Sequence, residues 1–482
     1  MHHDTAITLL ARLARREIGS RELLEHLVAR IERLDGRTRA VVSLDLERAR
    51  ARADEADRAL ARGERWGPLH GLPMTIKDSI ETAGLRTTSG SKVFELHVPG
   101  RDAVAVQRLK AAGAIVFGKT NLPTFAMDTQ SYNPLFGTTN NPWDLSRTAG
   151  GSSGGAAAAL AAGFTPLELG SDIGGSIRNP AHFCGVFGHK PSWGIVPQRG
   201  HVPGPPGTLS EADIAVVGPM ARSAADLALM LDVIAGPDEP DAVAWQLALP
   251  PPRRRALHEF RVVAWFDEPA MPIDDELRAV YASLVTRLRE RGVAVDESRR
   301  PRLDPAKALA TYWQLLFAAT SAGPPREVFD GLVQAAATLD AADDSANARL
   351  ARLATQRHRQ WLAANEARLK LREAWRAFFG EADVLLCPVS ASAAFPHDHS
   401  EPIGSRTIEV NGKPFPYTDQ LAWAGFIGVV GLPSTSVPVG RTARGLPVGV
   451  QVVGPRLEDR TPLVFAMAME EALGGFVAPP GY

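Results

Sequence analysis

The sequence predicts an α/β fold in which a large, mixed and mostly parallel sheet carries helices on both faces. Short apolar segments alternate with amphipathic ones along much of the chain, as expected of βαβ units. The clearest unit reads strand 74–78, helix 104–112 and strand 114–117. A chain of 482 residues, 45% of them hydrophobic, is long enough to bury such a sheet.

The N-terminal segment 1–65 is expected to be helical and to pack on the main body. Apolar residues between positions 23 and 34 recur with the period of one helix face, and Ser20 is the expected N-cap. A second helix is expected over about 44–62. Residues 66–482 are then expected to form one large domain, and the helical N-terminus leaves a homodimer open.

The rest of the chain supplies further elements of the sheet and of its covering layers. Strands are expected at 214–217, 261–266, 293–295, 384–389, 434–439 and 448–453. Helices are expected at about 224–235, 274–291, 306–321 and 356–378. The stretch from about 240 to 415 is rich in Pro, Arg and Ala, so we expect a variable region that builds the substrate pocket.

Charge and cysteine usage exclude several classes of protein. The formal net charge is -1, which gives no sign of a nucleic-acid partner. Two cysteines exclude a disulfide framework and favour a reducing compartment. The N-terminus lacks the pattern of a signal peptide, and no apolar run of about 18 residues predicts a membrane span. We therefore expect a cytoplasmic protein without a membrane partner.

Two clusters of glycine and serine carry the strongest chemical signal. The first covers 150–155 (GGSSGG) and the second covers 171–176 (SDIGGS), with a small-residue helix and a strand at 167–169 between them. Glycines allow backbone N–H groups to converge on a phosphate or on a developing oxyanion. The Gly-Lys-Ser/Thr ending of a phosphate-binding loop is missing, so the oxyanion interpretation is the better one, with Ser176 as the candidate nucleophile.

A serine nucleophile needs a base, and the sequence offers two kinds. His182 and His189 lie near Ser176 in the chain, but a single histidine is more often structural. Lys77 follows apolar residues at the end of a short strand, where burial would favour its neutral form. The pattern alone also allows a lysine that simply reaches solvent.

These motifs resemble the amidase signature family. The resemblance rests on GLPMTIKDSI around Lys77, on GGSSGG, and on GSDIGGSIRNPAHFCG around Ser176. Supporting matches lie at 118–121, 140–143, 431–440 and 445–455, so the resemblance spans roughly residues 10 to 475. It implies the fold of that family for 66–482, and hydrolysis of carbon–nitrogen bonds without a metal or cofactor.

The resemblance also implies a role for each matching residue. Ser176 would be the nucleophile, Lys77 the base, and Ser152 the bridge between them. The backbone N–H groups of residues 173–176 would form the oxyanion hole, namely Ile173, Gly174, Gly175 and Ser176. Three further residues would organise this centre without taking part in the chemistry, namely Ser153, Asp172 and Arg178.

Other kinds of site are weaker on the same residues. Ser153 is the centre of a G-x-S-x-G match, as in α/β-hydrolases, but the polar segment before it argues against the strand that such a motif needs. Cys184 lies in an apolar setting that suits a buried small residue. His397 and His399 alternate on an expected loop and make a poor metal site.

The substrate is the least determined part of the sequence. Pocket walls are expected from residues near 125–128 and from the stretches 306–322 and 390–430, and the candidate binding residues are Phe125, Met127, Asp128, Trp313 and Phe317. Their aromatic content favours a small-molecule aryl amide, with carbamates or esters as side substrates. The alternative is a glutaminase-type subunit of a tRNA-dependent amidotransferase complex, which the same family includes.

Overall fold

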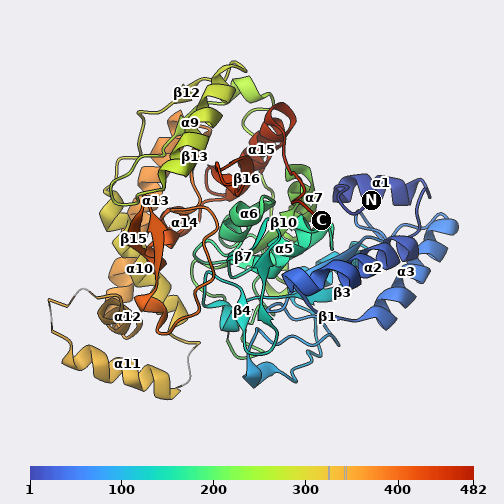
Figure 1. The fold of residues 1–482 in the computed structure, drawn as a ribbon, viewed down its shortest axis with the longest axis horizontal. Helices are drawn as coiled ribbons and strands as arrows, with labels where there is room; N and C mark the ends of the chain where they lie inside the picture. The colour runs from blue at the N-terminus through green and yellow to red at the C-terminus, as the bar shows by residue number, and fades with distance from the viewer. Residues whose placement is uncertain (203, 324–325, 341, 344) are drawn as a thin grey trace.

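The computed structural model describes residues 1–482 except 203, 324–325, 341 and 344. Its centre is an eleven-stranded mixed sheet flanked by helices on both faces, which confirms the predicted fold class (Figure 1). In spatial order the strands are β1 (Val41–Leu44), β3 (Ile115–Thr120), β2 (Pro73–Lys77), β8 (Leu167–Asp172), β10 (Val216–Ala221), β9 (Phe187–Lys190), β16 (Ser434–Arg441), β17 (Pro447–Val453), β13 (Val384–Pro388), β11 (Val262–Ala264) and β12 (Val295–Asp296).

Parallel pairing is confined to two groups of strands. One group is β3, β2 and β8, and the other is β13, β11 and β12. Every other neighbouring pair of the sheet is antiparallel, so the mostly parallel character that we predicted holds only within these groups. The first group brings the carboxyl ends of β2 and β8 to the same edge of the sheet, which is where the candidate catalytic residues lie.

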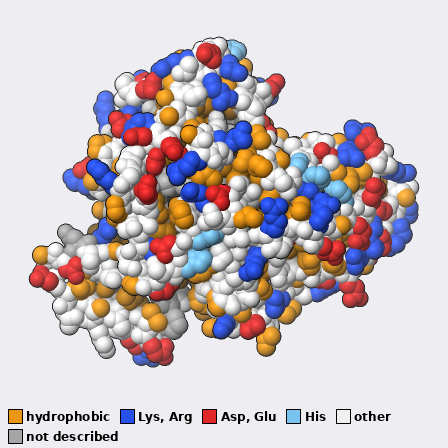
Figure 2. Space-filling model, viewed as in Figure 1, with side chains coloured by type: hydrophobic (Ala, Val, Ile, Leu, Met, Phe, Trp, Pro, Cys, Tyr) orange, Lys and Arg blue, Asp and Glu red, His pale blue; other side chains and the backbone are white. Residues whose placement is uncertain are grey.

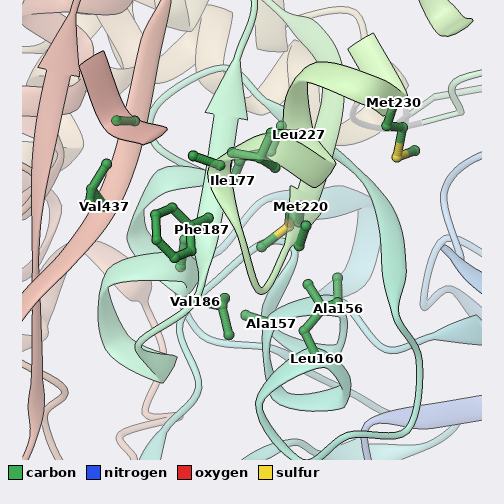
Figure 3. Packing of buried hydrophobic residues seen from close by; sticks show 14 of the residues in the cluster. Ala156, Ala157, Leu160, Ile177, Val186, Phe187, Met220, Leu227, Met230 and Val437 are labelled. Atoms are coloured by element: carbon green, nitrogen blue, oxygen red, sulfur yellow. The ribbon is translucent and has the colours of Figure 1, made fainter. Parts of the chain in front are cut away.

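The helices at the centre of the fold are built from small and apolar residues. All eight residues of α5 (Gly154–Ala161) are buried, and α5 packs on α6 (Arg178–Cys184). Three further helices pack around the same sheet, namely α4 (Val104–Ala111), α7 (Ala224–Ile234) and α15 (Arg460–Leu473). In Figure 3, Ala156, Ala157 and Leu160 of α5 lie below Met220 and beside Val186, and Leu227 of α7 lies above Met220. Alanine and glycine let the α5 backbone approach the strands closely, which fixes the loop that precedes this helix.

The N-terminal segment forms three helices and one strand of the sheet. The helices are α1 (Ala6–Ala14), α2 (Ser20–Thr38) and α3 (Leu46–Ala61), at the right of Figure 1. The predicted N-cap is off by one residue, because Gly19 is the N-cap of α2 and Ser20 is its first residue. The Asp57 carboxylate accepts the N–H groups of Ser20 and Arg21 at 2.7 and 3.1 Å, so the end of the helix is satisfied from α3.

In two segments the observed secondary structure differs from the predicted one. The strand expected at 214–217 begins at Val216, because Ile214 adopts a φ of 55° and the pairing with β8 starts after it. The small strand β7 (Asp144–Thr148) precedes the first glycine and serine cluster, although its polar sequence argued against a strand. It pairs with β6 (Asn140–Asn141) in a hairpin outside the main sheet, so cross-strand pairing there needs no apolar face.

The stretch 240–415 is mainly helical. Its helices are α8 (Glu239–Ala242), α9 (Asp275–Arg289), α10 (Pro305–Thr320), α11 (Arg326–Thr338), α12 (Ala346–Ala354) and α13 (His358–Glu381). The hairpin β14 (Thr407–Val410) and β15 (Lys413–Pro416) lies at the end of the stretch, and the helix α14 (Ala422–Gly428) follows it. Elsewhere, β4 (Tyr132–Asn133) pairs with β5 (Gly137–Thr138). The helices α11 and α12, which lie at the lower left of Figure 1, were not predicted. Within the part of the chain that is described, no helix is long and apolar enough to cross a bilayer.

The face of the molecule in Figure 2 mixes charges of both signs. Lys and Arg side chains lie among Asp and Glu side chains over this face, with hydrophobic side chains between them.

Candidate active site

Lys77 is the last residue of β2 and is buried beneath the two glycine and serine clusters. Its side chain is 0% exposed, and its amine lies within hydrogen-bond distance of three hydroxyl groups. The Nζ atom lies 2.6 Å from Ser152 Oγ, 3.0 Å from Ser153 Oγ and 3.0 Å from Ser171 Oγ. The structure therefore brings together a strand end and both clusters, which lie far apart in the sequence.

The surroundings of Lys77 favour its neutral amine. Burial lowers the pKa of Lys77 to about 7 and is the largest effect. The charges of Asp172 and Glu168 act in the opposite direction and raise this pKa. No carboxylate forms an ion pair with this amine among the described residues. A neutral amine that contacts a serine hydroxyl can accept its proton, which a lysine in water at the same pH seldom can.

Ser152 and Ser176 line the same cavity from two different loops. Ser152 lies just before α5, after a cis peptide bond with Gly151, and Ser176 lies between β8 and α6. The N–H of Ser153 donates to the carbonyl oxygen of Ser176 at 3.0 Å, which ties the two loops together. Ser152 is fully buried and Ser176 is half-buried, so Ser176 is the more accessible of the two. The greater exposure of Ser176 suits a nucleophile that must reach the substrate, and the burial of Ser152 suits a residue that links Ser176 to Lys77.

Backbone N–H groups lie beside Ser176, with one correction to the predicted set. The N–H of Gly175 donates to Asp172 Oδ1 at 2.8 Å, because the turn folds back over that carboxylate. This leaves Ile173, Gly174 and Ser176 as candidate oxyanion donors. Their N–H groups have no partner among the described residues, and all three residues line the cavity.

Asp172 and Arg178 form a fully buried ion pair under this loop. Arg178 Nη2 lies 2.7 Å from Asp172 Oδ1, and Arg178 Nε lies 3.0 Å from Asp172 Oδ2. Burial would raise the pKa of Asp172, but the charge and hydrogen bonds of Arg178 hold it at about 2. Arg178 also donates to Ala424 O and Gln451 Oε1, both at 2.8 Å. The pair holds the loop that carries Ser176, and of its two members Asp172 lines the cavity.

Sequence reasoning missed two serines of this centre. Ser171 accepts a hydrogen bond from Lys77, and its place in the second cluster is the signal that could have found it. Ser131 accepts the N–H of Gly154 at 3.0 Å and donates to the Gly150 carbonyl at 3.0 Å. No motif distinguishes Ser131, because it supports the first cluster from a separate loop.

A cavity of about 580 Å³ opens in front of Ser176, and the five predicted binding residues line it. Trp313 and Phe317 stack on each other along α10 with ring centroids 5.9 Å apart, and Phe125 and Met127 lie on a loop at another wall. Asp128, unlike these apolar residues, has polar partners. Arg406 Nη1 lies 2.7 Å from Asp128 Oδ2, and the Tyr417 hydroxyl donates a hydrogen bond to Asp128 Oδ1. Its carboxylate is therefore engaged in holding this loop.

Three aromatic residues of the stretch 390–430, which was expected to supply pocket walls, are core residues. Phe395, Trp423 and Phe426 are buried and are not part of the cavity lining. Phe426 packs edge-to-face on Trp265, with ring centroids 5.5 Å apart. Their aromatic character therefore gives no information about the substrate.

The weaker interpretations find little support in the structure. The strand before Ser153 belongs to a separate hairpin, so it does not form the strand-turn-helix elbow of an α/β-hydrolase. Burial raises the pKa of the Cys184 thiol, which makes this residue a poor nucleophile. Across the described ranges, His, Cys, Asp and Glu side chains form no group of three or more that could hold a metal, and this includes the loop of His397 and His399.

Known proteins resemble this chain over nearly its whole length. The family model described as Amidase matches residues 22–463. A glutamyl-tRNA(Gln) amidotransferase subunit from Synechococcus sp. (strain CC9605) is 35% identical over 96% of this chain and 95% of its own length.

Solved structures show the same fold. A vestigial protein complex that bears on the origins of an s-triazine catabolic enzyme has a TM-score of 0.82 and 29% identity, over 97% of this chain and 98% of that one. A bacterial aryl acylamidase has a TM-score of 0.80 and 25% identity, over 98% of this chain and 96% of that one. On the extent of these matches, the chain is an enzyme of the amidase signature family, which hydrolyses carbon–nitrogen bonds other than peptide bonds.

Proposed function

We propose that this enzyme hydrolyses carboxylic amides through an acyl-enzyme on Ser176, with Ser152 and Lys77 as its proton relay. The observation that carries the proposal is the contact of 2.6 Å between the buried Lys77 amine and Ser152 Oγ, beside the cavity that Ser176 also lines. A lysine in contact with a serine and without a carboxylate partner is suited to proton transfer.

The proposed reaction has two acyl-transfer steps. Ser176 attacks the amide carbonyl carbon while its proton passes to Ser152, whose own proton passes to Lys77. The N–H groups of Ile173, Gly174 and Ser176 hold the oxyanion. The relay then returns a proton to the nitrogen of the leaving amine, and the C–N bond breaks. Water attacks the acyl-enzyme by the same route and releases the carboxylic acid.

The cavity favours an acyl or amine group with a bulky apolar part. Apolar side chains dominate its walls, including Phe125, Trp313, Leu316, Phe317 and Leu421. An aryl ring buried against Trp313 and Phe317 gains roughly 1.5–3 kcal/mol from the area removed from water. We therefore propose aryl amides as substrates, with carbamates and esters as side substrates because they present the same carbonyl.

The test uses one acyl group on three leaving groups. An anilide, a carbamate and an ester are assayed with the wild type, with Ser176→Ala and with Lys77→Met. We expect Ser176→Ala to lose all three activities by about 10³-fold or more while its circular dichroism is unchanged. Wild-type rates in a folded Ser176→Ala variant would contradict the proposal.

A second candidate function is the glutaminase subunit of a tRNA-dependent amidotransferase, and the curated relatives favour it. One feature of the cavity agrees with a small zwitterionic substrate. Arg349 and Asp419 both line it, and neither has an ion-pair partner within 4.0 Å among the described residues. A cation and an anion in one wall would complement the α-carboxylate and α-amino groups of glutamine.

Ammonia release from free glutamine separates the two candidates. If the chain is a glutaminase subunit, the purified chain alone should release ammonia only slowly from glutamine and should be inert on anilides. Full activity should then require the partner subunits. Rapid anilide hydrolysis by the chain alone would contradict the second candidate. The same preparation, run on a sizing column, tests the homodimer that the helical N-terminus leaves open.

A further inference from the structure

A second cavity of about 700 Å³ adjoins the catalytic one. Three residues line both cavities, namely Trp313, Arg349 and Asp419. The lining of the second cavity includes the exposed residues Ala270, Pro272 and Ala310, so it opens to solvent. None of its described lining residues takes part in the proposed reaction, so the reaction alone does not explain this cavity.

One face of α10 runs from the second cavity into the catalytic one. Residues from the first half of the helix line the second cavity, and residues from the second half line the catalytic cavity. In order along the helix, this face includes Ala306, Ala310, Trp313, Phe317 and Thr320. Spacings of three and four residues keep these side chains on the same side of a helix. At 1.5 Å per residue, the face is about 21 Å long.

The helix α12, which packs on α10, passes from one cavity to the other in the same way. Asn347 and Leu350 line the catalytic cavity, Leu353 lines the second cavity, and Arg349 lines both. Two packed helices therefore border both cavities, which places the cavities end to end along them.

The second cavity favours an apolar ligand group. Away from the shared wall, its polar side chains already have partners: Gln314 Nε2 lies 2.9 Å from Gln356 Oε1, and Arg352 Nη1 donates to the Asp343 carbonyl at 2.7 Å. The rest of its lining is apolar, namely Ala270, Pro272, Ala306, Leu309, Ala310, Leu353, Phe415 and Ala422. A polar ligand group there would lose water without gaining a free partner.

The shared wall is different, because its polar side chains are not engaged. Arg349 and Asp419 form no ion pair with any described residue. An ether or carbonyl oxygen that passes between the two cavities can therefore accept a hydrogen bond from Arg349. Trp313, the third residue of this wall, is half-buried, so a change of its rotamer can join the cavities.

We propose that the second cavity is a distal subsite for amides whose acyl group carries a second apolar ring. The first ring lies against Phe317, the linking oxygen passes Arg349 where Trp313 turns aside, and the second ring lies against Leu309 and Phe415. The inference rests on the proposed function, whose aryl-amide substrates it narrows to elongated ones.

The test fills the second cavity from outside. Ala310 lines this cavity and not the catalytic one, so Ala310→Trp should block the distal subsite alone. The control is Lys307→Trp, which adds the same side chain to the same helix at a position that lines neither cavity and is 86% exposed. The substrates are the para-nitroanilides of benzoic acid and of para-benzyloxybenzoic acid, with one and two rings in the acyl group.

We expect Ala310→Trp to lower kcat/KM for the two-ring anilide by roughly 10- to 100-fold, mostly through KM, as the loss of two or three buried methylene groups would. The one-ring anilide should stay within about twofold of the wild type, and Lys307→Trp should match the wild type on both. Equal losses on both anilides, or an unchanged rate on the two-ring anilide, would overturn the distal subsite.

Binding to a Ser176→Ala background separates this inference from the proposed function. Calorimetry on that background needs no turnover, and adding Ala310→Trp should weaken binding of the two-ring anilide by the same factor. Unchanged binding would overturn the subsite whatever the rates are. By contrast, hydrolysis of the one-ring anilide that survives Ser176→Ala would overturn the proposed function and leave the binding result standing.

Discussion

The pH dependence of amide hydrolysis tests the state of Lys77 directly. At a pKa of about 7, about half of the Lys77 side chains are neutral at pH 7 and about a tenth at pH 6. A lysine at its ordinary pKa would be neutral in only about one molecule in 3000 at pH 7. Burial beneath Ser152 therefore raises the neutral fraction by about 10³-fold, and this fraction limits the rate if the amine is the base.

The sign of the effect follows from the role of the group. The base must be neutral, so kcat/KM should fall about tenfold for each pH unit below 7 and level off above about pH 8. The assay is anilide hydrolysis from pH 5 to 9 at constant ionic strength, on the wild type and on Lys77→Arg. Arginine keeps its charge over this range, so this variant should be inactive throughout.

A matched control comes from a second buried lysine. Burial also lowers the pKa of Lys190 to about 7, but its amine donates to the Pro191 carbonyl at 2.7 Å and, among the described residues, contacts no cavity serine. The acid limb should therefore stay in place in Lys190→Met. Two results would refute the assignment of Lys77. One is a wild-type pH–rate profile whose acid limb has its midpoint near pH 10, and the other is an acid limb that shifts in Lys190→Met only.

Three further predictions concern the loops around the site. Ser153→Ala removes one of three hydroxyl contacts of Lys77 and should keep anilide kcat/KM within about tenfold of the wild type; a complete loss would favour Ser153 as a reacting group. Asp172→Asn leaves the buried Arg178 charge uncompensated and should lower the free energy of unfolding by about 3–5 kcal/mol in urea titrations, and no change would contradict the buried ion pair. Gly155→Ala would place a Cβ 2.3 Å from Asn121 N and should destabilise the fold by about 1–3 kcal/mol, whereas Gly36→Ala, with open space around it, should not, and equal melting temperatures would contradict this packing.

The sequence predicted the sheet and the catalytic clusters because both depend on local patterns. Apolar strands and glycine-rich turns are local features, and β2, β3 and β8 follow from them. The order of the strands depends on pairing between distant segments, which explains why the antiparallel centre was not predicted. The helices α11 and α12 were missed although apolar residues recur on one face of each, because the Pro, Arg and Ala content of the stretch 240–415 led us to expect a variable region there.

Within the site, the residue types were predictable and their contacts were not. Lys77 and Ser152 follow from motifs, but Ser171 takes part only because β8 pairs with β2. Asp128 was predicted on the basis of its position near the pocket, whereas its partner Arg406 lies 278 residues away.

The pairing of β2 with β8 also bears on when activity arises during protein synthesis. Lys77 leaves the ribosome about 5–20 s before Ser176 at the usual rate of elongation. Until β8 docks against β2, Lys77 is a hydrated cation, and its amine cannot take a proton from a serine. The nascent chain is therefore expected to hold no active hydrolase before the parallel pair closes, so catalytic competence requires this long-range pairing.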